Sequence, residues 1–215
     1  YNTLDSTLIA ETSETTFTHA NLDPEADYCY SVSAVYSEGE SRETLPVCAD
    51  YFTPSSRSSL LAAINLWGVD SLAATLAYGE IAVWDVSSVT NMTFLFKDDS
   101  LFNSDISAWD ISNVTDVSGM FNNAFNFNGD LSSWDVSYVT NMYSMFENAE
   151  SFAGDLSLWD VSNVTDMRHM FHGCAKFNQP LNNWDTSKVT NMYGMFYGAS
   201  NFNQQLNNWD VSNVT

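Results

Sequence analysis

The chain repeats one pattern every 25 residues, and this period constrains the fold more than any other feature. Each copy opens with Trp-Asp, as in residues 134–158, WDVSYVTNMYSMFENAESFAGDLSL. Five copies are complete and a sixth stops at Thr215. The tryptophans that open the copies are Trp84, Trp109, Trp134, Trp159, Trp184 and Trp209. A fixed period of about 20–50 residues is typical of arrays whose units stack and bury one continuous core.

Comparison of the copies separates nearly constant apolar columns from variable polar ones. In the third copy, the apolar columns are occupied by Trp134, Val136, Val139, Met145, Phe146, Ala149, Phe152 and Leu156. One unit is too small to bury these side chains by itself. We therefore expect them to point inward and to pack against the equivalent residues of neighbouring copies.

The start of each copy is interpreted as a β-strand. Leu131-x-x-Trp134-x-Val136 has the Leu-x-x-Leu-x-Leu spacing of a leucine-rich-repeat strand. Alternation along a strand would turn Trp134 and Val136 inward and Asp135 and Ser137 outward. Stacked copies would then form a parallel sheet.

The middle of each copy is interpreted as a short helix. In the third copy, residues 141–149 carry apolar side chains at a spacing of three and four, and Thr140 is a candidate N-cap. The predicted fold class is an α/β repeat solenoid of short parallel strands and short helices. A β-propeller of Trp-Asp blades is excluded, because a blade needs four strands in about 40 or more residues.

Composition limits the partners of the chain. Six Lys+Arg stand against 27 Asp+Glu, a net charge of -21, so phosphate backbones and anionic lipids are repelled. The 45% of hydrophobic residues is enough for a core. No apolar run reaches the length of about 20 residues that a membrane span needs, and no signal peptide is visible. We expect the natural chain to continue beyond both ends.

Residues 55–83 are predicted to be a linker and a helical cap. A Ser-rich start precedes the apolar segment 60–67, which ends at Gly68, and a second helix over residues 72–78 would end at Gly79. The end of a stacked array exposes apolar side chains. A helix pair directly before the first copy is well placed to cover them.

Residues 1–54 have the alternation of β-strands, and they contain Cys29 and Cys48. Two nearby cysteines in a small β-module indicate a disulfide and an oxidising compartment, and two buried thiols are the alternative. The pattern Leu22-x-Pro24-x-x-x-Tyr28 resembles the tyrosine corner of fibronectin type III domains. The resemblance implies the C-terminal half of such a sandwich, acting as a spacer.

The repeats themselves resemble a known family. Residues 159–185, WDVSNVTDMRHMFHGCAKFNQPLNNWD, are similar to the BspA-like leucine-rich repeat of bacterial surface proteins, first catalogued as a mycoplasma domain of unknown function. Residues 60–90 resemble the cap of that array. The resemblance covers about residues 57–215 and implies a secreted or surface-attached protein with adhesive or protein-binding roles. Together with the cysteine-containing module, it implies a Bacteroidota protein exported by the type 9 route.

The aspartates that follow the tryptophans are the first candidate ligand-binding residues. They are Asp85, Asp110, Asp135, Asp160, Asp185 and Asp210. On adjacent strands they would form an exposed row, with neighbours that repel by about 0.8 kcal/mol in water. Hydrogen bonds from serine or backbone, a ligand, or a cation would relieve this repulsion. Ca²⁺ prefers six to eight oxygen ligands, and a flat row of carboxylates offers few of them to one ion. We therefore favour hydrogen-bonded, structural aspartates, and no cofactor is predicted.

Two other groups of residues were weighed as chemical sites. Asp105, Asp130 and Asp155 form a second acidic column that ends at Pro180, and they fit turns in the return loop. His169, His172 and Cys174 have a spacing that invites a metal site. Both histidine columns vary between copies and Cys174 replaces a buried alanine, so no metal is predicted.

No catalytic constellation is present, since the chain has no phosphate loop, no nucleophile elbow and no singular carboxylate pair. We therefore expect an extracellular or cell-surface adhesin or protein-binding module, and not an enzyme. Its expected partners are protein or glycan ligands, with no nucleic acid and no membrane insertion. A passive stalk is one alternative. A carbohydrate-binding accessory region is another, and it requires that Tyr143, Tyr193 and Tyr197 gather into a platform.

Overall fold

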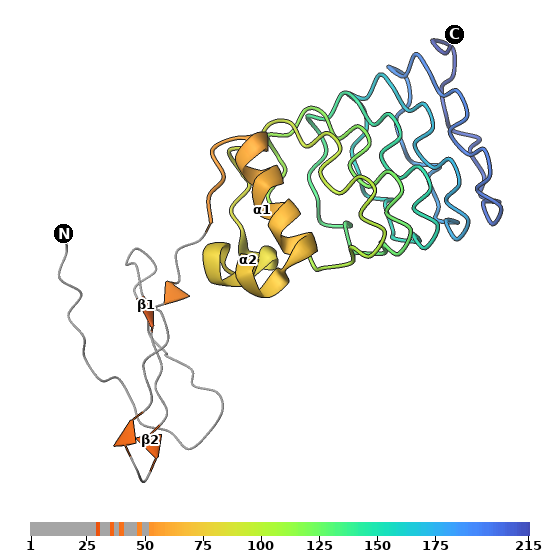
Figure 1. The fold of residues 1–215 in the computed structure, drawn as a ribbon. Helices are drawn as coiled ribbons and strands as arrows, with labels where there is room; N and C mark the ends of the chain where they lie inside the picture. The colour runs from red at the N-terminus through yellow and green to blue at the C-terminus, as the bar shows by residue number, and fades with distance from the viewer. Residues whose placement is uncertain (1–28, 31–34, 37–38, 41–46, 49–51) are drawn as a thin grey trace. The chain divides into compact units, whose positions relative to one another are not determined.

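The structure is a computed structural model, and the residues that it describes are 29–30, 35–36, 39–40, 47–48 and 52–215. The chain divides into two units, Tyr1–Cys48 and Ala49–Thr215. Each unit is described by itself. The described part of the second unit contains two α-helices and a short 3-10 helix, η1 (Ile81–Val83), followed by the stacked repeats (Figure 1).

The described part of the first unit consists of four strands of two residues each. They are β1 (Cys29–Tyr30), β2 (Val35–Tyr36), β3 (Gly39–Glu40) and β4 (Val47–Cys48). β1 pairs with β4 and β2 with β3, both antiparallel, as two separate ladders. A fibronectin type III sandwich needs two larger sheets that face each other over a core. The predicted sandwich is therefore wrong, because ladders this short do not form two facing sheets.

Two further predictions for this unit remain untested. Cys29 and Cys48 are register partners in the β1–β4 ladder. Their side chains lie outside what the structure describes, so the disulfide stays a prediction. The tyrosine-corner residues Leu22, Pro24 and Tyr28 also lie outside the described residues.

The first helix of the second unit, α1 (Arg57–Val69), begins at a capping box. Ser56 accepts from the backbone N–H of Ser59 at 3.2 Å, and the Ser59 hydroxyl accepts from the backbone N–H of Ser56 at 3.1 Å. These bonds satisfy two N–H groups that a helix start leaves free. The buried residues of α1 are Leu60, Ala63 and Ile64.

The two cap helices are separated by Asp70, and not by Gly68 as the sequence had predicted. The Asp70 carboxylate accepts from the backbone N–H of Ala73 at 2.9 Å and thereby caps α2 (Ser71–Tyr78). Gly79 follows α2 with φ 72, a left-handed conformation that glycine adopts without steric cost. The helical cap thus forms from local capping chemistry.

Aromatic side chains join the cap to the first repeat. The rings of Phe52, Trp67 and Tyr78 lie 5.1, 6.0 and 6.1 Å from the ring of Trp84, measured between centroids. The indole N–H of Trp67 also donates to the Ser104 hydroxyl at 3.1 Å. Phe52, which the sequence had assigned to the first module, therefore packs with the repeats.

The predicted inward columns of the repeats are buried. Phe121, Phe146 and Phe171 stack at 5.6 and 5.7 Å between ring centroids in successive repeats. Within one repeat, Phe146 lies 4.1 Å from Phe152, so two phenylalanine columns run side by side through the core. Burial of each ring contributes about 2 kcal/mol, and favourable ring pairing adds about 1 kcal/mol.

The tryptophan column adds a hydrogen bond in each repeat. The indole N–H of Trp134 donates to the carbonyl oxygen of Ile106 at 3.2 Å, and that of Trp159 donates to Leu131 at 2.9 Å. Both partners lie 28 residues earlier in the chain. A buried indole N–H needs such an acceptor, which explains why each copy opens with tryptophan.

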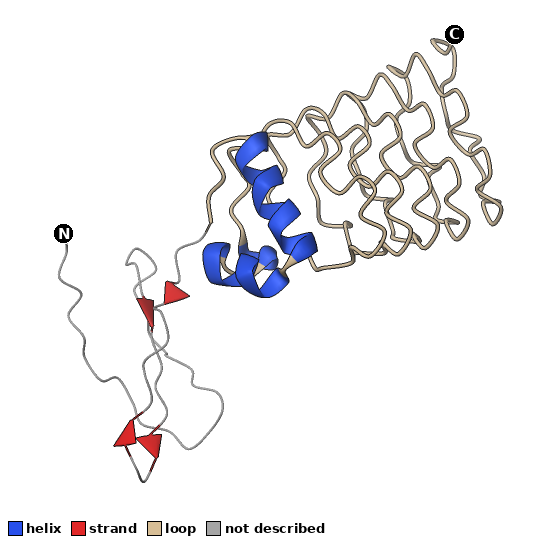
Figure 2. Ribbon diagram, viewed as in Figure 1, coloured by secondary structure: helices blue, strands red, loops and turns tan. Residues whose placement is uncertain are grey.

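The predicted fold class is wrong for the repeats. Residues 84–215 contain neither an extended strand nor an α-helix, and Figure 2 shows them as turns and loops. Single-residue parallel bridges join the copies, as at Asp116 to Asn141. Within a copy, turns close over three residues: the N–H of Trp134 donates to Leu131, and that of Met145 to Met142. The repeat is a stack of turns.

Residues with a left-handed backbone explain why the helix predicted for the middle of each copy does not form. Ser144 and Asn148 have φ values of 52° and 58°, and equivalent positive values recur in the other four complete repeats. A left-handed residue in every turn is incompatible with an α-helix. The N–H groups of Ser144 and Phe146 instead donate to carbonyls of the next repeat, at Arg168 (2.8 Å) and Met170 (2.9 Å). The spacing of three and four residues between the apolar side chains therefore arises from consecutive turns and not from a helix.

Candidate functional site

The aspartates after the tryptophans stabilise turns. One carboxylate oxygen of each accepts the backbone N–H of the serine two residues later, at 2.9–3.0 Å. The pairs are Asp85–Ser87, Asp110–Ser112, Asp135–Ser137, Asp160–Ser162, Asp185–Ser187 and Asp210–Ser212. Outward placement was predicted correctly, but on a strand. The structure shows that each carboxylate holds a turn, and a ligand role for these exposed residues stays a prediction.

These hydrogen bonds favour the charged form of the aspartates. The Ser112 hydroxyl and backbone N–H lower the pKa of Asp110, and those of Ser187 do the same for Asp185. For Asp210, the backbone N–H and then the hydroxyl of Ser212 lower the pKa. Within residues 52–215, this column places no three ligand groups around one point. The Ca²⁺ alternative for this column stays an untested prediction.

The second acidic column has the same turn-forming role that the sequence predicted for it. Asp105, Asp130 and Asp155 accept the backbone N–H of the residue two positions later, each at 2.9 Å. Such Asx turns form wherever an Asp or Asn side chain can reach the backbone two residues on. All nine aspartates in these two columns therefore hold a turn.

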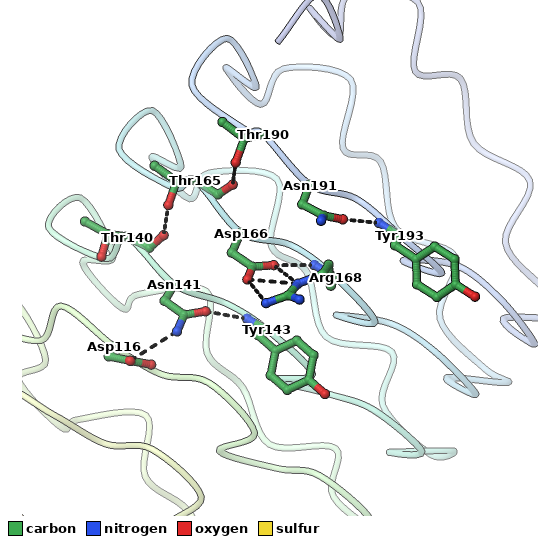
Figure 3. Close-up of polar contacts among 10 residues, drawn as sticks. All are labelled: Asp116, Thr140, Asn141, Tyr143, Thr165, Asp166, Arg168, Thr190, Asn191 and Tyr193. Carbon is green, nitrogen blue, oxygen red and sulfur yellow. Dashed lines mark hydrogen bonds and ion pairs between the residues drawn. The ribbon is translucent and has the colours of Figure 1, made fainter. Parts of the chain in front are cut away.

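A third polar column runs along the bridged edge of the repeats (Figure 3). The Thr140 hydroxyl donates to the Thr115 carbonyl at 3.2 Å instead of capping the predicted helix, and the Thr165 hydroxyl makes the equivalent bond to the Thr140 carbonyl at 3.1 Å. Asn141 and Asp166 each accept the N–H of the residue two positions later, at 3.0 Å. Asn and Asp therefore serve this turn equally well.

Arg168 connects this edge to an aromatic side chain. Its guanidinium donates to both carboxylate oxygens of Asp166, at 2.6–3.0 Å. The guanidinium carbon lies 5.1 Å from the centre of the Tyr143 ring. This arrangement is a cation–π contact, and it fixes the arginine beside an aromatic surface (Figure 3).

Glu147, His169 and His172 form a cluster that the sequence did not predict. Nδ1 of His172 lies 3.0 Å from Oε1 of Glu147, and one metal-ligating atom from each of the three residues lies within 4.8 Å of the others. Asn122 donates to the second Glu147 oxygen at 3.0 Å. Burial raises the pKa of Glu147, but the nearby Ser144 hydroxyl and the two histidines lower it overall.

Cys174 does not join the cluster, as the sequence had indicated. Its thiol is buried and donates to the carbonyl oxygen of Phe146 at 2.8 Å. Burial raises the pKa of the Cys174 thiol. A protonated, buried thiol is a core residue and not a metal ligand.

The signal for the cluster was present in the period. Glu147 and His172 are 25 residues apart, so they occupy the same column in consecutive repeats. His169 lies three residues before His172, one turn away. The variation of these columns between copies predicts no site at this position. The stacked structure shows instead that residues from variable columns of neighbouring repeats can meet and form a cluster at one position in the array.

Tyrosines surround the two histidines. The rings of Tyr143 and Tyr193 lie edge-on to His169, with centroids 6.2 and 5.3 Å away, and the ring of Tyr197 lies 5.2 Å from His172. A hollow of about 410 Å³ is lined by His169, His172, Tyr193, Gly194 and Tyr197. The three tyrosines therefore gather in one region of the surface.

Comparison with known proteins identifies the family. The family model described as "Mycoplasma protein of unknown function, DUF285" matches residues 69–161 and 153–215. The chain belongs to this family. The match supports the BspA-like repeat prediction for the DUF285 region, whereas the fibronectin and Bacteroidota parts of the resemblance receive no support from it. No curated protein and no solved structure matches the chain.

Among the described residues, no helix combines the length and apolar character that crossing a membrane requires. The longest helix, α1, has 13 residues and belongs to the cap.

Proposed function

We propose that this DUF285 protein is a surface adhesin or protein-binding module whose contact surface is a tyrosine patch. The tyrosine patch comprises Tyr143, Arg168, Tyr193 and Tyr197. One observation carries the proposal: three consecutive repeats bring tyrosine and arginine side chains together on one surface region, beside a hollow that Tyr193 and Tyr197 line. The family description is consistent with a surface repeat protein and assigns no function.

The exposure of the patch supports a role in binding. Tyr193 and Tyr197 are 72% and 73% exposed, although contact between a large aromatic side chain and water is unfavourable. Tyr and Arg are the residues that most often dominate the energy of protein interfaces. Arg168 is held by Asp166, so little side-chain entropy would be lost on contact.

The charge of the chain indicates the kind of partner. A net charge of -21 attracts basic protein surfaces and speeds their association. It opposes contact with nucleic acids and anionic membranes. A protein with a basic surface around an apolar pocket therefore fits this patch. Location outside the cell follows from the family resemblance and is part of the proposal.

An array of purified extracellular proteins and glycans would test the proposal. We expect the labelled chain to bind one or more basic proteins, and the double variant Tyr193→Ala/Tyr197→Ala to lose at least about 90% of that binding, as expected when hot-spot residues are removed. Tyr138→Ala is the matched control, because Tyr138 is 66% exposed and lies outside the patch. Equal loss in both variants, or retained binding in the double variant, would contradict the role of the patch.

The carbohydrate-binding alternative is favoured by the gathering of the tyrosines, since sugars stack on exposed aromatic rings beside a hollow. In the same experiment this alternative predicts binding to neutral glycans. Such binding should depend only weakly on salt concentration, whereas binding to basic proteins should weaken as salt is added. The passive-stalk alternative predicts that no ligand is retained and that the double variant behaves as the parent chain.

A further inference from the structure

We propose that Glu147, His169 and His172 bind one transition-metal ion of the zinc class. Two imidazoles and one carboxylate are the donor types that Zn²⁺ takes in proteins. Ca²⁺ and Mg²⁺ prefer oxygen ligands, and this cluster offers a single carboxylate. Among the described residues, it is the one group of three such side chains whose ligand atoms lie this close together. The inference goes beyond the proposed function, because it holds whether or not the tyrosine patch binds a protein.

The distances are close to those of a bound ion. Zn–N bonds of about 2.0–2.1 Å place tetrahedral ligand atoms about 3.3 Å from one another. Glu147 and His172 already meet at 3.0 Å. The widest separation in the cluster is at most 4.8 Å, so a shift of about 1–2 Å by rotation of the His169 side chain closes the site.

The state of His169 points to a missing ligand. Its Nδ1 atom is buried and has no hydrogen-bond partner among the described residues. Buried ring nitrogens are normally satisfied, so an unpartnered one needs an explanation. The contact between His172 and Glu147 explains those two side chains as a pair but leaves His169 without a role. A metal ion bound at Nδ1 would supply this partner.

The backbone holds His169 in place at a steric cost. His169 has φ 56, in the left-handed region, where the equivalent residues Gly119 and Gly194 have φ 60 and 64. A Cβ atom on Gly194 would lie 2.8 Å from Cε1 and Nδ1 of His169. Glycine at position 194 therefore leaves room for the imidazole. Phe94 and Ser144, in the same column, have φ 55 and 52, so this conformation recurs in every complete repeat and fixes where the imidazole stands.

The surroundings support and complete the site. Asn122 donates to Oε2 of Glu147 at 3.0 Å and orients the carboxylate, as outer-shell partners of metal sites do. The side chains of His172 and Glu147 are 26% and 22% exposed, so an ion can reach them. The hollow beside Tyr193 and Tyr197 leaves space for a fourth ligand, either water or a side chain of a bound molecule.

Titration of the whole chain with ZnCl₂ after chelator treatment tests the inference. We expect one strong site per chain, and visible absorption of a four-coordinate ion when Co²⁺ replaces Zn²⁺. The variants Glu147→Asn, His169→Gly and His172→Asn should each bind Zn²⁺ at least about tenfold more weakly. Each substitution uses a residue found in the same column of another repeat, Asn122 or Gly119, so the fold is retained.

The control is Phe94→Gly, which makes the equivalent change to His169→Gly in the first repeat and removes no ligand. It should bind Zn²⁺ as tightly as the parent chain. Absence of a one-to-one site, or equal affinity in the parent chain and His169→Gly, would overturn the proposal. The titration uses the chain alone, so failure of the array experiment leaves its result unaffected.

Discussion

Oε1 of Glu147 lies 3.0 Å from Nδ1 of His172, its counterpart in the next repeat. The two residues are 25 positions apart, and stacking places them on the same column. In every column of the array, residues 25 positions apart lie next to each other. This stacking forms the phenylalanine core, the rows of turn-forming aspartates and the metal-ligating cluster.

The phenylalanine core should be sensitive to loss of a single ring. Phe146 is fully buried and stacks on Phe121, Phe152 and Phe171, so Phe146→Ala should lower the free energy of unfolding by about 3–5 kcal/mol. Urea unfolding followed by tryptophan fluorescence measures this change. The control Phe125→Ala removes a ring that is 41% exposed and should cost much less. Similar losses in both variants would contradict the stacked core.

The left-handed backbone of the repeats should show in glycine substitutions. Gly194→Ala adds a Cβ atom 2.8 Å from the His169 ring at φ 64, so it combines conformational strain with a clash. Gly198→Ala, at φ 75, meets nothing closer than an ordinary contact of 3.5 Å and has strain alone. We expect Gly198→Ala to cost about 1–2 kcal/mol and Gly194→Ala to cost more. The melting temperatures of the two variants test this order, and the reverse order would argue against the placement of His169.

Acid should weaken the turns held by aspartates. The backbone N–H and hydroxyl of Ser132 lower the pKa of Asp130 below its ordinary value of 3.8, against smaller opposing effects of burial and Asp105. The unfolded chain therefore binds more protons, and this contribution is complete above pH 3.8 and is lost as the pH falls through the lowered folded value. Stability should decline in that acid range.

The variant Asp130→Asn isolates this effect. Asn keeps the oxygen that accepts the turn hydrogen bond, as Asn141 does, but it does not titrate. We expect slightly lower stability at pH 7, where the carboxylate of the parent chain makes its full contribution, and a shallower decline of the melting temperature between pH 5 and pH 2 than in the parent chain, because an acid-linked contribution is removed. The exposed carboxyl control Glu150→Gln should retain the parent slope. If Asp130→Asn keeps the parent slope of melting temperature against pH, then protonation of Asp130 does not affect the stability of the fold.

Several features of the fold could be read from the residues. The burial of Trp134, Val136 and Phe146 followed from constant apolar columns, and the cap helices followed from Ser56 and the glycine after α2. The turn role of Asp130 also followed from its type and position. Each of these depends on side-chain chemistry and on contacts within a few residues, which local sequence expresses.

The secondary structure of the repeat could not be read in the same way. A helix and a chain of turns both bury side chains at a spacing of three and four, so Met142, Met145 and Phe146 fit either. The choice depends on where the backbone N–H groups find acceptors. In this chain they donate to the adjacent repeat, as from Phe146 to Met170 at 2.9 Å, which favours left-handed residues and excludes the helix.

The sequence by itself determined the period, the inward side chains, the cap and the acidity, because these depend on residue type and spacing. Only the tertiary structure decided the turn backbone and the meeting of Glu147 with His169 and His172. Both depend on contacts between residues about one full repeat apart. The free energy of those contacts comes from stacking, so the local pattern of one copy does not contain it.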